Sequence, residues 1–156
     1  MKTEILNELE QKFEEMRKEL KMKTTLEELD SVFFIKDFIL NEGFVSERLS
    51  RQICSRISHT YGLWVNYLNS ILLPNPTYMP LQIESKPFSS KEEREKIWTI
   101  IKKSMEIMSR NTLVGLTKNK KEEAQFIEDA IVLWNNEIKD ELTRIIKKTN
   151  KNWKEE

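Results

Sequence analysis

The feature that most restricts the fold of this chain is the distribution of its proline and glycine residues. The 156 residues include only three glycines and four prolines. All four prolines lie between Pro74 and Pro87, and no stretch alternates apolar and polar residues as a half-buried β-strand does. Proline lacks a backbone donor and disfavours helical geometry in the residue before it. The sequence therefore predicts an all-α protein with one long non-helical segment.

Apolar residues recur at helical spacing in five stretches of the chain. This pattern predicts an antiparallel helical bundle of about five helices, which form a single domain over residues 1–156. A long proline-rich crossover connects the third helix to the fourth, and the tail after the fifth helix is expected to fray. The five predicted helices occupy residues 3–22, 25–42, 44–73, 89–115 and 120–148.

Sequence signals mark several of the helix ends. Thr25 with Glu28 and Ser90 with Glu93 have the spacing of a capping box, in which a hydroxyl accepts a hydrogen bond from a backbone N–H three residues later. Gly43 follows the second predicted helix and is expected to end it, because glycine readily adopts the left-handed conformation found after many helices.

The crossover, residues 74–88, is expected to be ordered but without helix. Its prolines interrupt helical hydrogen bonding. Tyr78, Leu81 and Ile83 can anchor it on the bundle, because a fully buried apolar side chain contributes about 1.5–3 kcal/mol.

The central stretch, residues 44–73, has two different faces. The first is apolar and is expected to lie in the core; it consists of Ile53, Cys54, Ile57, Thr60, Tyr61, Trp64, Leu68, Ile71 and Leu72. The second is small and polar, and it includes Ser55, Ser58, His59, Gly62, Asn66 and Asn69. Between Gln52 and Leu73 the only charged residue is Arg56, although 33% of the whole chain is charged.

The lack of charge on the small polar face predicts that another surface covers it, either the first helix or a second copy of the chain. Small residues such as Gly62 let a partner backbone approach closely. Close packing would also explain a mid-helix glycine, which costs about 1 kcal/mol relative to alanine. We therefore expect a homodimer or a higher homo-oligomer whose interface contains these six residues.

The charge and cysteine content restrict the partners and the compartment. Lys plus Arg and Asp plus Glu number 26 each, so no net charge attracts nucleic acid or an anionic membrane. The single cysteine, Cys54, cannot form an internal disulfide and suits a reducing cytoplasm. The charged first residues are unlike a signal peptide, and no apolar run reaches the roughly 20 residues that span a bilayer. These features predict a cytoplasmic protein without a membrane segment, and the high Glu, Lys and Ile content resembles that of thermophile proteins.

The basic C-terminal tail supports an alternative function. Four lysines flank Trp153, and basic residues beside an aromatic ring can hold phosphate groups and stack a base. Against this, two glutamates follow directly, and lysines near a helix C-terminus also complement the helix dipole. The candidate residues for a nucleic-acid-associated regulatory protein are Lys147, Lys148, Lys151, Trp153 and Lys154.

An enzymatic alternative is a small hydrolase with a site near His59, the only histidine of the chain. A single histidine excludes histidine-rich zinc sites within one copy. Two carboxylate pairs, Glu92-x-x-Glu95 and Glu137-x-x-Asp140, have the spacing of magnesium-binding motifs in helical nucleotide pyrophosphohydrolases. They point away from the apolar stripes of their helices, so surface charge explains them better, and we expect neither a metal nor a cofactor.

The sequence contains no Gly-rich phosphate loop, nucleophile elbow or paired-cysteine motif. It therefore favours a non-enzymatic helical-bundle protein that acts through self-association or another protein–protein interaction.

Overall fold

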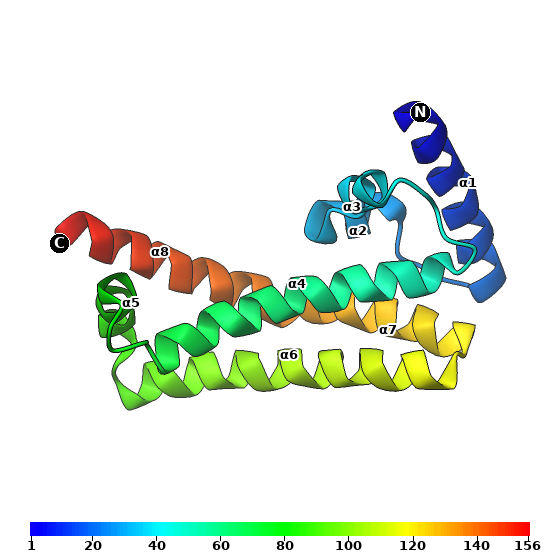
Figure 1. Ribbon diagram of the computed structural model, residues 1–156. Coiled ribbons are helices and arrows are strands. Elements are labelled where there is room, and N and C mark those ends of the chain that lie inside the picture. The colour runs from blue at the N-terminus through cyan, green and yellow to red at the C-terminus, as the bar shows by residue number, and fades with distance from the viewer. The chain divides into compact units, whose positions relative to one another are not determined.

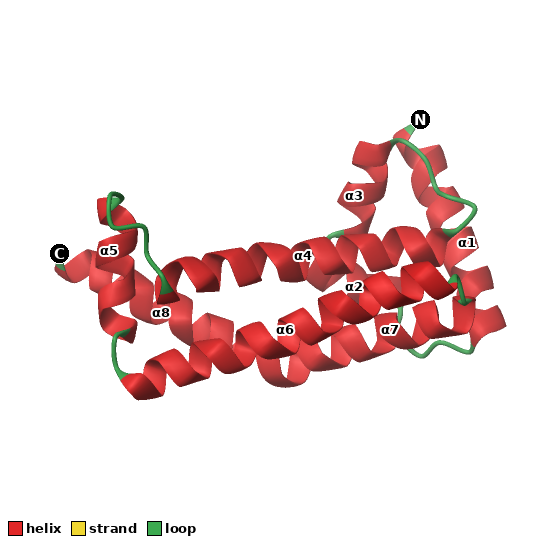
Figure 2. Ribbon diagram, turned by 60° about the horizontal axis from the view of Figure 1, so that its bottom comes forward, coloured by secondary structure: helices red, strands yellow, loops and turns green.

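The computed structural model describes residues 1–156 and consists of helices and short connections, without strands (Figure 1, Figure 2). The prediction of an all-α protein is confirmed. No helix combines the length and the apolar composition needed to cross a bilayer. In chain order the elements are α1 (Lys2–Leu20), α2 (Leu26–Phe33), α3 (Ile35–Glu42), α4 (Leu49–Leu72), α5 (Met79–Ser85), the 3-10 helix η1 (Lys86–Phe88), α6 (Lys91–Thr117), α7 (Lys120–Leu133), the π-helical turn η2 (Trp134–Ile138) and α8 (Lys139–Glu155).

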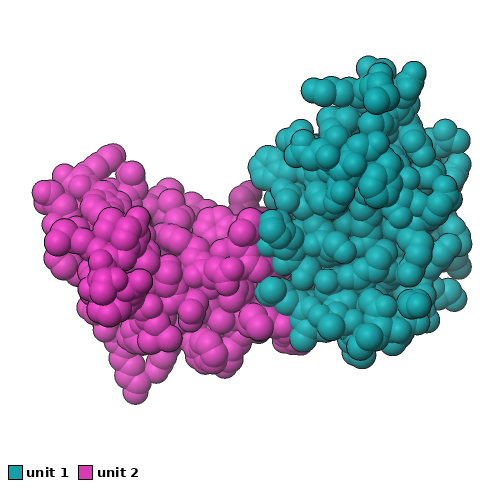
Figure 3. All heavy atoms as spheres, viewed as in Figure 1, with its two compact units in different colours: residues 1–60, 107–132 teal, residues 61–106, 133–156 magenta.

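Contacts between residues divide the chain into two compact units (Figure 3). Unit 1 contains residues 1–60 and 107–132, and unit 2 contains residues 61–106 and 133–156. A single domain over residues 1–156 stays a prediction.

The core of unit 1 is built from aliphatic and phenylalanine side chains on every helix of the unit. Leu9 and Phe13 of α1 are buried, and α1 packs against α3. Side chains with almost no exposed surface come from α1 (Leu9, Phe13), α2 (Leu29, Phe33), α3 (Ile35, Ile39), α4 (Ile53, Ile57) and α7 (Phe126, Ile127, Ala130).

The core of unit 2 continues the apolar face of α4. Tyr61 is buried, and its ring packs edge to face on Trp134 with the ring centroids 5.9 Å apart. Burial also raises the pKa of the Tyr61 hydroxyl, which keeps it protonated. The other buried apolar side chains are Leu68, Ile71, Phe88, Ile97, Ile100, Ile101, Ile138, Leu142 and Ile145.

The prediction of one continuous helix over residues 25–42 is wrong, because this stretch forms two helices joined at Phe34. Phe34 has φ 53° and ψ 50°, in the left-handed region. Its N–H donates to the carbonyl of Asp30 at 2.9 Å, and the Asp30 carboxylate accepts from the N–H of Lys36 at 2.8 Å. The break lets Phe33 and Ile35 both lie fully buried, while Phe34 between them stays 55% exposed. The Arg56 side chain donates to the freed carbonyl of Phe33 at 2.8 Å.

The crossover was predicted to lack helix, and this is also wrong. Residues 79–85 form α5, and residues 86–88 form a 3-10 turn. Pro80 and Pro87 each lie in the first turn of their element, where a missing N–H leaves no hydrogen bond unmade. α5 packs against α8, and the Asn152 side chain donates to the carbonyl of Ile83 at 3.0 Å.

The tail expected to fray is helical, because α8 runs to Glu155 and its last turns contact α5. The predicted fifth helix is therefore longer than expected, and the π-helical turn η2 interrupts it.

The predicted helix ends agree more closely with the structure. The Thr25 hydroxyl accepts from the N–H of Glu28, and the Ser90 hydroxyl accepts from the N–H of Glu93, each at 3.2 Å. Gly43 follows α3 with φ 84°, in the left-handed region that glycine adopts without strain.

The strained backbone at Phe34 gives a stability test. We expect Phe34→Gly to raise the free energy of unfolding by about 1 kcal/mol, because a residue with a Cβ costs about 1–2 kcal/mol in the left-handed conformation and the exposed ring contributes little. Urea denaturation followed by circular dichroism measures the change. Phe33→Ala is the contrasting variant and should lower stability by about 3–5 kcal/mol. A loss of stability in Phe34→Gly would show that the exposed ring matters more than the backbone.

Candidate functional site

The small polar face of α4 lies at the surface of a single chain. Four of its six residues are exposed and two are half-buried, so the first helix does not cover it. Of the two surfaces that the sequence analysis offered as a cover for this face, the first helix is therefore excluded and a second copy of the chain remains. The exposed residues are Ser55, His59, Asn66 and Asn69, and the half-buried ones are Ser58 and Gly62. The first three in chain order, Ser55, Ser58 and His59, belong to unit 1, and the others belong to unit 2.

The unit 2 part of this face continues into exposed apolar side chains that the sequence analysis did not single out. Leu63 is 57% exposed and Leu73 is 71% exposed. We call Gly62, Leu63, Asn66, Asn69 and Leu73 the α4 surface, and it carries no formal charge.

A groove lies between the α4 surface and the start of α6. It has a volume of about 620 Å³, and its apolar lining comes from Leu72, Leu73 and Trp98. Trp98 is 52% exposed. Arg94 lines the edge of the groove and donates to the carbonyl of Leu72 at 3.0 Å. This hydrogen bond satisfies one of the free carbonyls at the C-terminus of α4.

The structure separates the residues of the predicted nucleic-acid cluster. The Trp153 indole N–H donates to Glu84 of α5 at 3.1 Å. Lys148 lies 3.4 Å from the Glu93 carboxylate and above the Phe88 ring at 5.5 Å. The ring and one of the four lysines are therefore held by other parts of unit 2. Lys147, Lys151 and Lys154 remain exposed.

The residues of the enzymatic alternative do not converge. His59 is exposed, and no group of three or more His, Cys, Asp or Glu residues could hold a metal ion. Three of the carboxylates in the two motifs form surface ion pairs with lysines. These pairs are Glu92 with Lys96, Glu95 with Lys91, and Glu137 with Lys103.

Sequence analysis missed a buried carboxylate in unit 1. Glu123 lies in the first turn of α7 with no exposed surface. Its Oε1 accepts from Arg48 Nη2 and from Ser50 Oγ, each at 3.1 Å, and its Oε2 lies 3.8 Å from Arg51 Nη1. Ser50 is in the first turn of α4, where the positive end of the helix dipole also favours an anion.

Arg51 extends this cluster to α6. Its guanidinium donates to the backbone carbonyl of Asn111 at 3.2 Å and also to the Asn111 side chain. Gly115 makes room for it, since a Cβ at that position would lie 3.2 Å from Arg51 Nη1. The cluster thus connects three helices of unit 1 through one carboxylate.

The signal for this cluster in the amino-acid sequence is weak. Glu123 follows two lysines and another glutamate, which is typical of a solvated helix end. The unusual feature is at its partners, because Arg48 directly precedes an otherwise nearly uncharged helix and Arg51 lies in its first turn.

Cys54 lies beside this cluster in the core. Its thiol donates to the carbonyl of Glu123 at 3.6 Å. Burial raises the pKa of the Cys54 thiol to about 12. The prediction that Cys54 lies buried in the core is confirmed.

Comparison of the chain with protein-family models, with curated proteins and with solved structures finds no match.

The buried carboxylate predicts a large loss of stability on neutralisation. We expect Glu123→Gln to lower the free energy of unfolding by about 2–3 kcal/mol, because it leaves two arginines without their buried counter-charge. The matched control is Glu122→Gln, an exposed neighbour, which should change stability by less than about 0.5 kcal/mol. Urea denaturation of both variants decides the matter, and equal effects would contradict a role for the buried charge.

The raised pKa of Cys54 predicts an unreactive thiol. A folded-state pKa of about 12 leaves almost no thiolate at pH 8, and burial excludes the reagent. We expect no reaction with Ellman's reagent at pH 8 in the folded protein and rapid release of one equivalent of chromophore in denaturing urea. Rapid labelling of the folded protein would show that the core around Cys54 opens.

Proposed function

We propose that this protein is a non-enzymatic antiparallel helical bundle that acts through self-association, with two copies meeting at the α4 surface. The observation that carries this proposal is an exposed helix face without charge, in a chain of which 33% is charged.

Exposed apolar area supports the proposal. Leu63 of α4, Leu73 directly after this helix and Trp98 across the groove are each more than half exposed. Contiguous apolar area with a polar border is typical of protein–protein contact sites. Trp and other aromatic residues are also enriched at the centres of such interfaces.

The chemistry of the α4 surface favours a second copy of the same chain as the partner. Asn66 and Asn69 both donate and accept hydrogen bonds, so the same side chains can pair across a two-fold axis. Gly62 presents no side chain and permits the two α4 helices to approach closely.

The nucleic-acid alternative keeps one supporting observation. Lys147, Lys151 and Lys154 are exposed and lie within about 60° of one another around α8, given about 100° of rotation per residue. They could contact phosphates without Trp153. No observation favours a hydrolase at His59.

Self-association predicts a mass of two chains in solution at micromolar concentration, measured by size-exclusion chromatography with light scattering. Leu73→Glu should shift the protein to the monomer, because it places a charge in the contact. Gly62→Leu should weaken the dimer by about 5–150-fold, which corresponds to an overpacking cost of 1–3 kcal/mol.

The control for this experiment is Leu116→Glu, which adds the same charge at a 76% exposed leucine of α6 outside the α4 surface. It should leave the dimer intact. A mass of one chain for the unaltered protein ends the proposal. Retention of that monomer on heparin, lost with rising salt, would favour the nucleic-acid alternative instead.

A further inference from the structure

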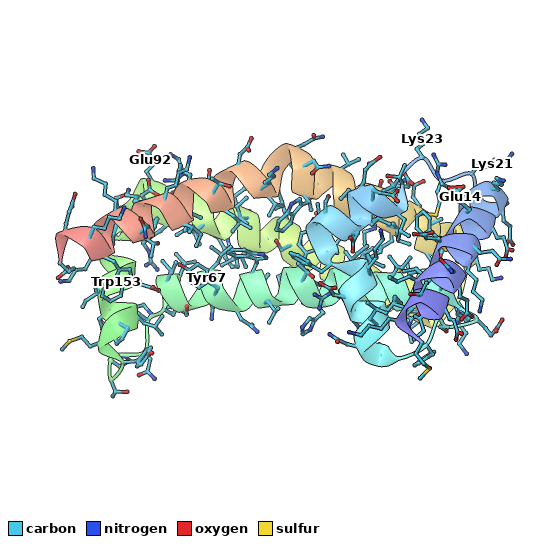
Figure 4. The ribbon with its side chains drawn as sticks, turned by 90° about the horizontal axis from the view of Figure 1, so that it is seen from above. Glu14, Lys21, Lys23, Tyr67, Glu92 and Trp153 are labelled. Carbon is cyan, nitrogen blue, oxygen red and sulfur yellow. The ribbon has the colours of Figure 1, made fainter.

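A second hollow in unit 2, which we call the aromatic groove, lies among α4, α5 and α8 and has a volume of about 380 Å³. Ligand pockets in proteins begin at about 300 Å³, so this groove has room for a small molecule. Figure 4 shows Tyr67 and Trp153 at this end of the unit. The residues that line it and carry the argument are Trp64, Tyr67, Glu84, Thr149, Asn150 and Trp153.

Two aromatic rings of α4 form walls at nearly right angles. The ring centroids of Trp64 and Tyr67 are 5.9 Å apart, and their planes make an angle of 83°. Both side chains are half-buried, so each is held in place while part of its surface stays accessible. Burial raises the pKa of the Tyr67 hydroxyl, against a hydrogen bond with Thr149 that lowers it, so this ring is neutral at physiological pH.

Trp153 supplies a third ring from α8, and its orientation is fixed by the hydrogen bond from its indole N–H to Glu84. The side chain is 38% exposed. Its polar atom is thus already paired, and what remains accessible is the ring itself, whose face attracts cations.

Glu84 is the only charged side chain that lines the aromatic groove. It is half-buried, and its Oε1 accepts the hydrogen bond from Trp153. The exposed lysines of α8 lie on other sides of the helix, since Ile146, Thr149, Asn150 and Trp153 form the stripe that faces the groove. The groove therefore combines three aromatic rings with a net charge of one negative.

We propose that the aromatic groove binds a small organic cation of the quaternary ammonium class. Such a cation has no N–H to satisfy, so its desolvation is inexpensive and its methyl groups can contact ring faces directly. A primary ammonium fits less well, because its three N–H groups need acceptors and the groove offers only the remaining oxygens of Glu84 and Asn150. A nucleotide fits less well, because rings at right angles do not sandwich a base and the carboxylate repels phosphate.

The test compares choline with 3,3-dimethylbutan-1-ol, which has the same shape without the charge. Binding is followed by tryptophan fluorescence and by isothermal titration calorimetry on the full chain. We expect choline to bind about fivefold or more tightly than the neutral alcohol, the size of a cation–π contribution of about 1 kcal/mol.

Variants locate the site. Glu84→Gln keeps an oxygen to accept the Trp153 hydrogen bond, and it should weaken choline binding about fivefold while leaving the neutral alcohol unchanged. Trp153→Leu should weaken choline binding by a similar factor. Glu155→Gln is the matched control outside the groove and should change neither affinity.

Three outcomes would overturn the proposal. The first is equal affinity for choline and the neutral alcohol, which would make the groove merely apolar. The second is no saturable choline binding. The third is choline binding that survives both Glu84→Gln and Trp153→Leu in variants whose circular dichroism matches the unaltered protein.

Discussion

A carboxylate removed from water needs a counter-charge and hydrogen-bond donors inside the protein, and Glu123 of α7 finds both at the N-terminal end of α4. Ser50 and Arg51 lie in the first turn of α4, Arg48 lies directly before this helix, and Arg51 also binds Asn111 of α6. An unpaired buried charge would cost several kcal/mol, so the three helices are held in one register along their axes.

The helical class and the apolar face of α4 follow from the sequence because both depend on short-range periodicity. Ile53, Ile57 and Leu68 are buried as their spacing predicts. The break at Phe34 could not be predicted from periodicity, because its cause is tertiary packing. Phe33 and Ile35 are both buried, and the side chain of Arg56, which is distant in sequence, donates a hydrogen bond to the carbonyl of Phe33. The helix α5 was missed because a proline in a first turn is harmless, and rules about proline in helix interiors do not apply there.

The candidate sites show the same division. The uncharged face of α4 could be recognised from composition, and in the structure it is exposed to solvent. What covers it could not be predicted, because the proposed partner is a second molecule. The tail cluster was grouped by closeness in sequence, but on a helix Trp153 and Lys151 lie on different sides. The aromatic groove could not have been predicted, because Tyr67, Glu84 and Trp153 are brought together only by the packing of α5 against α8.

Gly115 shows how an electrostatic requirement can select a residue that has no charge. It lies within α6, where glycine is about 1 kcal/mol less favourable than alanine and where its backbone needs no unusual conformation. The room it leaves is occupied by the Arg51 guanidinium, which is held there by the carboxylate of Glu123 and by Asn111. Positions 51 and 115 are therefore coupled: a larger side chain at 115 is unfavourable while the Arg51 guanidinium is held beside it. Sequences that diverge from this one should be free to exchange glycine for alanine at 115 once Arg51 has been replaced by a smaller residue.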